Sequence, residues 1–218
     1  NLYLCATIYT HFMINIAILA SGNGTNAENI IRHFNDGNTG IQVRIVITNN
    51  HNAYVLRRAE MLGVKSVILP KETLLELQTP KDERRKDIKN PKIQDILKKY
   101  NINFIILAGY LLKIPESLIR KYPDKIINIH PALLPRYGGK GMYGAHVHEA
   151  VIAAREKESG ITIHLVNEKY DSGEILFQAK CQISPDETAD DLAAKIHLLE
   201  QTHFPRVIEE YILKHQSE

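Results

Sequence analysis

The feature that most limits the fold is a series of short apolar runs separated by segments with helical spacing. The first run, INIAILA at residues 14–20, is almost wholly apolar, as expected of a parallel strand covered on both faces. Comparable runs follow at residues 41–48, 64–69, 103–108 and 125–129. Strands that alternate with helices at this spacing predict βαβ units, right-handed crossovers and a mainly parallel sheet.

Helix-like segments lie between these runs. They occupy residues 26–34, 53–62, 93–100 and 115–120, and the last of them has a proline in its first turn. The charged segment 70–90 predicts a helical turn and a mobile loop. The first part of the chain therefore predicts a doubly wound α/β fold.

The second part of the chain no longer shows the regular alternation of apolar runs and helix-like segments. Residues 131–145 form a loop rich in Gly and Pro, and a helical segment follows at 147–158. Residues 160–166 and 175–183 predict two further strands. A tight turn through Asp171, Ser172 and Gly173 joins these strands, so antiparallel pairing is expected.

A long C-terminal helix is expected over residues 187–214, although Pro205 should interrupt or kink it. No change in composition demands a second domain. We expect one domain over residues 13–218, with residues 1–12 as an extension and Met13 as the natural start.

Composition excludes several classes of protein. The 218 residues are 44% apolar and 24% charged, with 27 Lys and Arg against 25 Asp and Glu. This near-neutral balance gives no reason to expect nucleic acid or an anionic membrane as a partner. No apolar run approaches the roughly 18–20 residues that span a bilayer. Cys5 and Cys181 are too few for a disulfide framework, and they indicate unpaired thiols of a cytoplasmic protein. The sequence leaves open a monomer or a homodimer.

The turn after the first strand reads SGNGTN, residues 21–26. Glycines permit a tight turn, and the N-terminus of the following helix offers unpaired N–H groups to an anion. Ala27 stands where the dinucleotide motif needs its third glycine, and the lysine of the P-loop is absent. The turn therefore predicts a phosphate site, although strand–helix turns are often Gly-rich for geometry alone.

Asn128 and His130 share one face of the strand that Pro131 ends, because side chains alternate across a strand. The carboxyl ends of strands are where open α/β sheets bind ligands. An amide donor beside an imidazole suits a reaction that develops an oxyanion and moves a proton, such as acyl transfer. Asp171 could orient His130 and raise its pKa, but Asp-Ser-Gly is also an ordinary hairpin turn.

Several segments resemble the phosphoribosylglycinamide formyltransferases of purine synthesis. They are IAILASGNGTN, FIILAGYLLKIP, INIHPALLPRYGGKGMYGAHVHEAV, GITIHLVNEKYDSGEIL and LEQTHFPRVIEE, in the family's order from about residue 14 to 211. The resemblance implies a Rossmann-like formyltransferase fold. It also implies an enzyme that transfers formyl from 10-formyltetrahydrofolate to the amine of 5-phosphoribosylglycinamide, through a tetrahedral oxyanion and without a metal.

The resemblance also implies roles for individual residues. Asn128 would stabilise the oxyanion, His130 would handle the proton, and Asp171 would keep His130 oriented and basic. Residues of the phosphate turn and one carboxylate would bind the ribonucleotide: Gly24, Thr25, Asn26 and Glu200. Residues around the pterin would be Leu111, Leu112, Lys113, Ile114, Asn128, Tyr170 and Gly173.

Some positions stay open at this point. Arg84 and Arg85 are candidates for the folate tail, although an exposed charge run is the plainer interpretation. Lys140 is a further candidate for the phosphate. His146, His148 and His164 could together suggest zinc, but the family's loop needs no metal, and His164 could instead support the crevice.

Two related enzymes are the nearest alternatives. A formyltetrahydrofolate deformylase would share the Asn, His and Asp but would carry a domain before the catalytic part. A methionyl-tRNA formyltransferase would carry a basic domain after it. A binding module without turnover is the non-enzyme alternative. The expectation from this sequence is the ribonucleotide enzyme.

Overall fold

The computed structural model describes residues 13–35, 37–71 and 92–215. The predicted extension at residues 1–12, Cys5 and almost all of the charged segment 70–90 lie outside these ranges.

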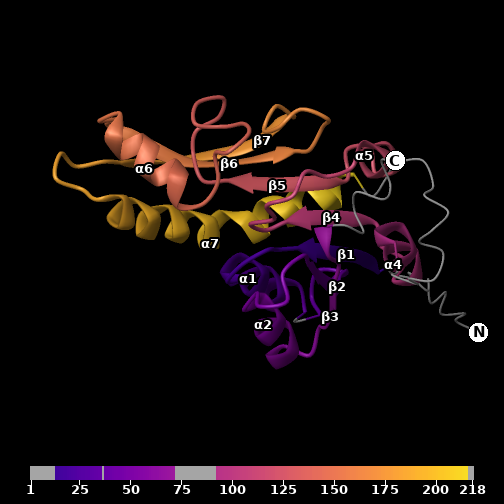
Figure 1. Cartoon of the computed structure of the whole chain (residues 1–218). Coiled ribbons are helices and arrows are strands. Elements are labelled where there is room, and N and C mark those ends of the chain that lie inside the picture. Colours follow the sequence, from indigo (N-terminus) through magenta and orange to yellow (C-terminus); the bar gives the residue numbers. More distant parts are fainter. Residues whose placement is uncertain (1–12, 36, 72–91, 216–218) are drawn as a thin grey trace, which may run out of the picture.

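Within the described residues, seven strands form one twisted sheet (Figure 1). Its spatial order is β3-β2-β1-β4-β5-β6-β7. The first five strands in sequence pair in parallel, whereas β6 pairs antiparallel with both β5 and β7. The predicted mainly parallel sheet with an antiparallel C-terminal strand pair is therefore confirmed. The strands are β1 (Ile14–Leu19), β2 (Ile41–Thr48), β3 (Lys65–Ile68), β4 (Phe104–Leu107), β5 (Ile126–His130), β6 (Glu158–Leu165) and β7 (Ile175–Gln182).

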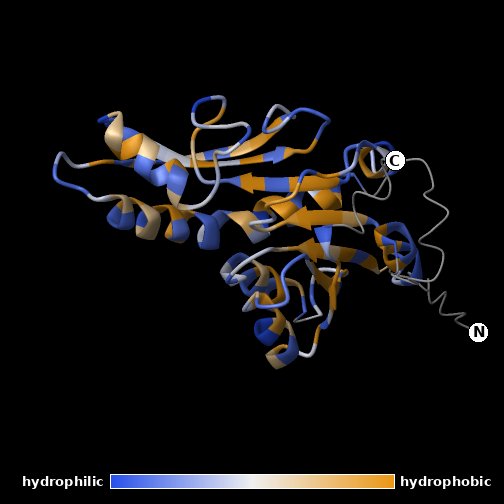
Figure 2. Cartoon of the chain, viewed as in Figure 1, coloured by the Kyte–Doolittle hydropathy of each residue, from blue (hydrophilic) through white to orange (hydrophobic). Residues whose placement is uncertain are grey.

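Helices cover both faces of the sheet. They are α1 (Thr25–Phe34), α2 (Val55–Met61), α4 (Ile93–Lys99), α5 (Glu116–Lys121), α6 (Ala145–Ala153) and α7 (Ala189–Lys214). Apolar residues of α1, α2, α6 and α7 join one core cluster, and those of α4 and α5 join a second. Successive side chains of β1 point to opposite faces of the sheet, so this strand contributes to both clusters. Ile16 and Ile18 belong to the first cluster, and Ala17 and Leu19 belong to the second. Figure 2 shows the apolar strands between these layers.

Two details differ from the sequence-based expectation. The helix predicted at 147–158 is α6, which ends at Ala153, because Arg155 adopts a positive φ of 53° and Glu158 already pairs with Gln182 of β7. The interruption predicted at Pro205 does not occur, and α7 runs through it without a break. Proline cannot donate to the carbonyl four residues earlier. That carbonyl, of Gln201, instead accepts a hydrogen bond of 2.8 Å from Asn29 Nδ2 on α1.

The sheet order creates a place for a ligand. From β1 the chain builds outward to β2 and β3 on one side, and it returns to the other side at β4. The loops that follow β1 and β4 therefore leave in opposite directions, which opens a crevice at their carboxyl ends.

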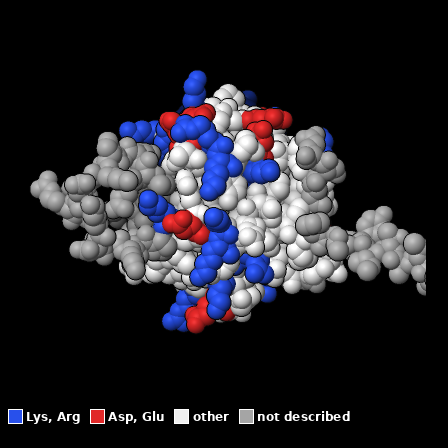
Figure 3. Space-filling model, turned by 90° about the vertical axis from the view of Figure 1, so that its right-hand side faces the viewer, with Lys and Arg blue, Asp and Glu red and all other residues white. Residues whose placement is uncertain are grey.

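The end of the molecule opposite this crevice carries both positive and negative side chains. Figure 3 shows Lys and Arg side chains in a band with acidic side chains among them, at the end where α4 and α5 lie in Figure 1. Both helices have exposed basic residues in the last turn, Lys98 and Lys99 on α4 and Arg120 and Lys121 on α5. These positive charges interact favourably with the partial negative charge at the C-terminal ends of the two helices, so they stabilise those helices. Within the described part of the chain, no helix is both long and apolar enough to cross a membrane.

Candidate active site

The crevice at the carboxyl ends of the strands is a cavity of about 1070 Å³. Its walls come from the turn after β1, the loop after β4, the end of β5, the loop before α6, the β6–β7 turn and α7. All but one of the predicted site residues line it: Gly24, Thr25, Asn26, Leu111, Leu112, Lys113, Ile114, Asn128, His130, Tyr170, Asp171 and Glu200. Gly173 is the exception. Its backbone packs against β6, where an added Cβ would lie 1.8 Å from the carbonyl oxygen of Leu165.

The glycine turn lies at one side of the cavity. Gly24 is the N-cap of α1 and has a left-handed φ of 78°, a conformation that side chains rarely adopt. A Cβ at Gly24 would also lie 2.4 Å from Cγ2 of Val55 on α2. Both the conformation and the space therefore require glycine. The first N–H groups of α1 stay available at the cavity edge, where an anion would be favoured.

Asn26 and Glu200 meet beside this turn. Asn26 Nδ2 donates to Glu200 Oε2 over 2.9 Å, which joins α1 to α7. The Oδ1 atom of Asn26 is buried and has no hydrogen-bond partner among the described residues. His197 Nδ1 lies 3.5 Å from the same carboxylate, and its hydrogen bond to Glu200 raises the pKa of His197. This corner of the cavity therefore offers a carboxylate and a free amide oxygen to hydroxyl groups.

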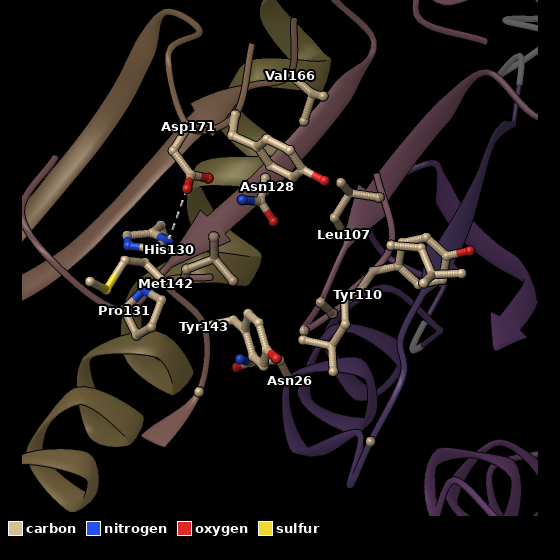
Figure 4. A pocket seen from close by; sticks show the side chains of 18 of the residues that line it. Asn26, Leu107, Tyr110, Asn128, His130, Pro131, Met142, Tyr143, Val166 and Asp171 are labelled. Carbon is tan, nitrogen blue, oxygen red and sulfur yellow. Dashed lines mark ion pairs between the residues drawn. The ribbon is translucent and has the colours of Figure 1, made fainter. Parts of the chain in front are cut away.

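His130 is 4% exposed at the end of β5. Its Nε2 atom lies 2.7 Å from the carbonyl oxygen of Tyr137 and must donate to it, because a carbonyl only accepts. In the neutral ring, Nδ1 is then the atom that takes up a proton. Nδ1 lies 3.8 Å from Asp171 Oδ2, the pair joined by the dashed line in Figure 4. Burial lowers the pKa of His130 below its ordinary value, although Asp171 and the Tyr137 carbonyl partly offset this by raising it.

Asp171 occupies a strained position in the turn between β6 and β7, with φ of 50°. Its Oδ2 atom accepts a hydrogen bond of 2.8 Å from the backbone N–H of Gly139, and Oδ1 lies 3.6 Å from His164 Nε2. Burial alone raises the pKa of Asp171, but the contacts with His164, Gly139 and His130 outweigh burial and lower the pKa overall. The group is therefore a carboxylate that faces two imidazoles.

Asn128 and His164 are direct partners in the antiparallel pairing of β5 with β6. Asn128 Nδ2 lies 3.1 Å from His164 Nε2, while His164 Nδ1 lies 2.8 Å from the carbonyl oxygen of Leu165. Since Nδ1 must donate to that carbonyl, the neutral ring accepts at Nε2, which sets the NH₂ end of Asn128 toward His164. Among the residues that the structure describes, the second N–H of the amide has no partner, so it can donate into the cavity that Asn128 lines.

The loop after β4 forms another wall. Ile114 is buried, while Leu111 and Lys113 are exposed at the rim. Tyr170 is 45% exposed, and Lys113 Nζ lies 6.0 Å from the centre of its ring. An apolar floor with a half-exposed aromatic ring at the rim suits a flat heterocycle.

The remaining candidates divide between the cavity and other places. Lys140, His148 and His164 line the cavity, whereas His146 does not. Burial lowers the pKa of His148, with a partial offset from Glu200. Across the ranges described, no group of three His, Cys, Asp or Glu side chains could hold a metal ion. Arg84 and Arg85 lie outside the described residues.

Sequence reasoning missed two backbone groups of the site, the carbonyl of Tyr137 and the N–H of Gly139. Their identity is invisible in a sequence, because any residue type supplies them. It also missed His197, for which the only signal was its position three residues before Glu200 on one helix face.

The chain is similar to known proteins over most of its length. Residues 14–208 match the family described as formyl transferase. The chloroplastic phosphoribosylglycinamide formyltransferase of Arabidopsis thaliana is 37% identical over 181 residues, which are 83% of this chain and 59% of that protein. The phosphoribosylglycinamide formyltransferase of Haemophilus influenzae is 34% identical over 197 residues, which are 90% of this chain and 86% of that protein.

A solved structure of phosphoribosylglycinamide formyltransferase from Bacillus halodurans superposes with a TM-score of 0.78 at 31% identity, covering 94% of this chain and 97% of that one. The matched region of the plant relatives is shorter than those proteins, since the chain spans 59% of the length of the relatives from Arabidopsis thaliana and Vigna unguiculata. The family match and the solved bacterial structure agree with the fold described above. The chain therefore belongs to the formyl transferase family.

Proposed function

We propose that this protein transfers the formyl group of 10-formyltetrahydrofolate to the amine of 5-phosphoribosylglycinamide, yielding formylglycinamide ribonucleotide and tetrahydrofolate in purine synthesis. The observation that carries the proposal is the meeting of Asn128, His130 and Asp171 at one end of a cavity whose other side is the glycine turn. The similar proteins named above are formyltransferases of phosphoribosylglycinamide, which supports this acceptor.

In the proposed reaction the substrate amine attacks the formyl carbon directly. The formyl oxygen becomes an oxyanion, and the free N–H of Asn128 donates to it. Donors fixed before the reaction lower the barrier because they need no rearrangement as charge develops. His164 fixes this donor by holding the other N–H of the amide.

The proton of the attacking amine passes to Nδ1 of His130, which is the unprotonated ring atom. The Asp171 carboxylate, 3.8 Å away, stabilises the imidazolium that forms. The tetrahedral intermediate then collapses to the formamide, the bond from carbon to the folate nitrogen breaks, and that nitrogen takes up the proton held by His130, which returns the ring to its neutral form. No side chain forms a covalent bond to the formyl group.

The ribonucleotide would lie along α1 and α7. Its phosphate would meet the N–H groups of Gly24, Thr25 and Asn26 at the start of α1. Its hydroxyl groups would donate to Glu200 and to the unpartnered Oδ1 of Asn26. The pterin would lie on the wall formed by residues 111–114, with Tyr170 at its edge.

Release of tetrahydrofolate, followed by absorbance with and without phosphoribosylglycinamide, tests the proposal. Release that requires the ribonucleotide supports transfer. Equal release without it would mean that water accepts the formyl group, and the proposal would be wrong.

A further inference from the structure

Helix α2 lies against the back of the glycine turn. The backbone N–H of Val55 donates to the carbonyl of Gly22 over 3.2 Å, and the Val55 side chain occupies the space beside Gly24. None of the residues of α2 lines the cavity. The helix therefore supports the turn from the side that faces away from the ligand.

Arg58 of α2 makes the most specific of these contacts. Its Nε atom donates to the backbone carbonyl of Asn23 over 2.8 Å, and Nη2 donates to the Oδ1 of Asn23 over 3.2 Å. Nη1 forms an ion pair with Glu28, in the first turn of α1. Each of the three guanidinium nitrogens thus bonds to the turn or to the helix that follows it.

These contacts decide where the oxygens of the turn point. A carbonyl that faced the cavity would repel an anion and would displace the N–H groups from it. Asn23 lines the cavity, yet its carbonyl is bonded to a side chain outside it. Glu28 would by itself repel an anion near the start of α1. The guanidinium groups of Arg32 and Arg58 hydrogen-bond to it, which lowers its pKa, and their two positive charges offset its negative charge.

We propose that Arg58 is a positioning residue for the ribonucleotide: it holds the carbonyl of Asn23 turned away, so that the N–H groups at the start of α1 face the phosphate. This inference rests on the proposed function for its ligand. Arg58 does not touch the ligand, and it acts on binding rather than on the chemical step. Lysine cannot replace it, because one ammonium group does not supply three donors in a planar fork.

The test compares Arg58→Ala and Arg58→Lys with Arg57→Ala, a change at the exposed neighbouring arginine. For both Arg58 variants we expect the KM for phosphoribosylglycinamide to rise about tenfold or more, while kcat and the KM for the folate change little. Arg57→Ala should match the wild type. A purely structural role for Arg58 would instead lower the melting temperature and raise both KM values together, which would overturn the inference, as would an unchanged ribonucleotide KM.

Binding of ribose 5-phosphate, measured by calorimetry, separates this inference from the proposed function. If the wild type binds this probe about tenfold or more tightly than Arg58→Ala, the inference stands even if no formyl transfer is observed. Equal affinity of the two proteins, or no binding by the wild type, would contradict it whatever the outcome of the transfer assay.

Discussion

Nδ1 of His130 lies 3.8 Å from Oδ2 of Asp171, although one residue ends β5 and the other occupies the turn between β6 and β7. The other ring nitrogen of His130 is held by a backbone carbonyl. The carboxylate therefore faces the atom that gains a proton, and it acts on the pKa of His130 in the direction opposite to burial. Burial is the larger and lowers it, while Asp171 raises it.

Asp171→Asn should move the acid limb of the pH profile of kcat/KM to lower pH. The neutral ring is the base, so activity rises as pH increases through the pKa of His130. Loss of the carboxylate removes an influence that raises this pKa, so the pKa falls and the acid limb moves to lower pH. The maximal rate should fall by roughly 10²–10⁴ because the imidazolium loses its partner. Asp186→Asn, at an exposed position, is the control, and an unchanged profile for Asp171→Asn would leave Asp171 as a turn residue only.

His130→Ala should nearly abolish transfer while both substrates still bind. A positioned base contributes about 10²–10⁴ to the rate, and the ring contributes little area to the cavity wall. Single-turnover rates and calorimetric affinities separate the two effects. The exposed His51 provides the control variant His51→Ala. Normal turnover by His130→Ala would exclude the proposed mechanism.

Asn128→Ala should lower kcat by about 10²–10³, the usual cost of losing one oxyanion donor. His164→Phe should lower kcat by about tenfold, because the donor remains but its orientation is no longer fixed. Steady-state kinetics of the two variants check this order. If His164→Phe were as active as the wild type, the contact of 3.1 Å between these side chains would have no part in catalysis.

Gly24→Ala should reduce both stability and ribonucleotide affinity. The left-handed φ costs about 1–2 kcal/mol for alanine, and the contact with Val55 adds about 1–3 kcal/mol of overpacking. Denaturant unfolding measures the loss. The double variant Gly24→Ala, Val55→Ala should recover only a small part of the loss, because Cβ and Cα of residue 55 would still lie 2.5 Å and 2.8 Å from the added methyl group. Gly22→Ala, which meets nothing within 4 Å, should unfold close to the wild type, and an equal loss there would contradict the steric explanation.

The fold could be predicted from the sequence because the parallel strands β1, β2 and β4 are short buried apolar runs, each followed by a helix-like segment. Confirmed boundaries, such as β2 at Ile41–Thr48, follow from apolar and β-branched residues. The interruption of the last helix predicted at Pro205 was wrong, because this proline removes only one backbone hydrogen bond of the helix. The carbonyl it frees, that of Gln201, finds Asn29 on α1, and only the tertiary structure brings that partner.

The candidate site was predictable in part. Alternation along a strand places Asn128 and His130 on one face, and both line the cavity. The partnership of Asn128 with His164 depends on the register between β5 and β6, which the sequence does not reveal. Nothing in the sequence pointed to the contacts of Arg58 with the glycine turn either, because a basic residue on an amphipathic helix normally lies on the solvent-exposed face.

The central claim is that the formyl group passes directly to the amine of the ribonucleotide. Folate carrying a ¹³C-labelled formyl group, incubated with the protein and phosphoribosylglycinamide, tests this claim when the products are followed by NMR. The account predicts that the label appears in the formamide of the ribonucleotide product, with none in free formate. Label in formate at the rate of tetrahydrofolate release would contradict it.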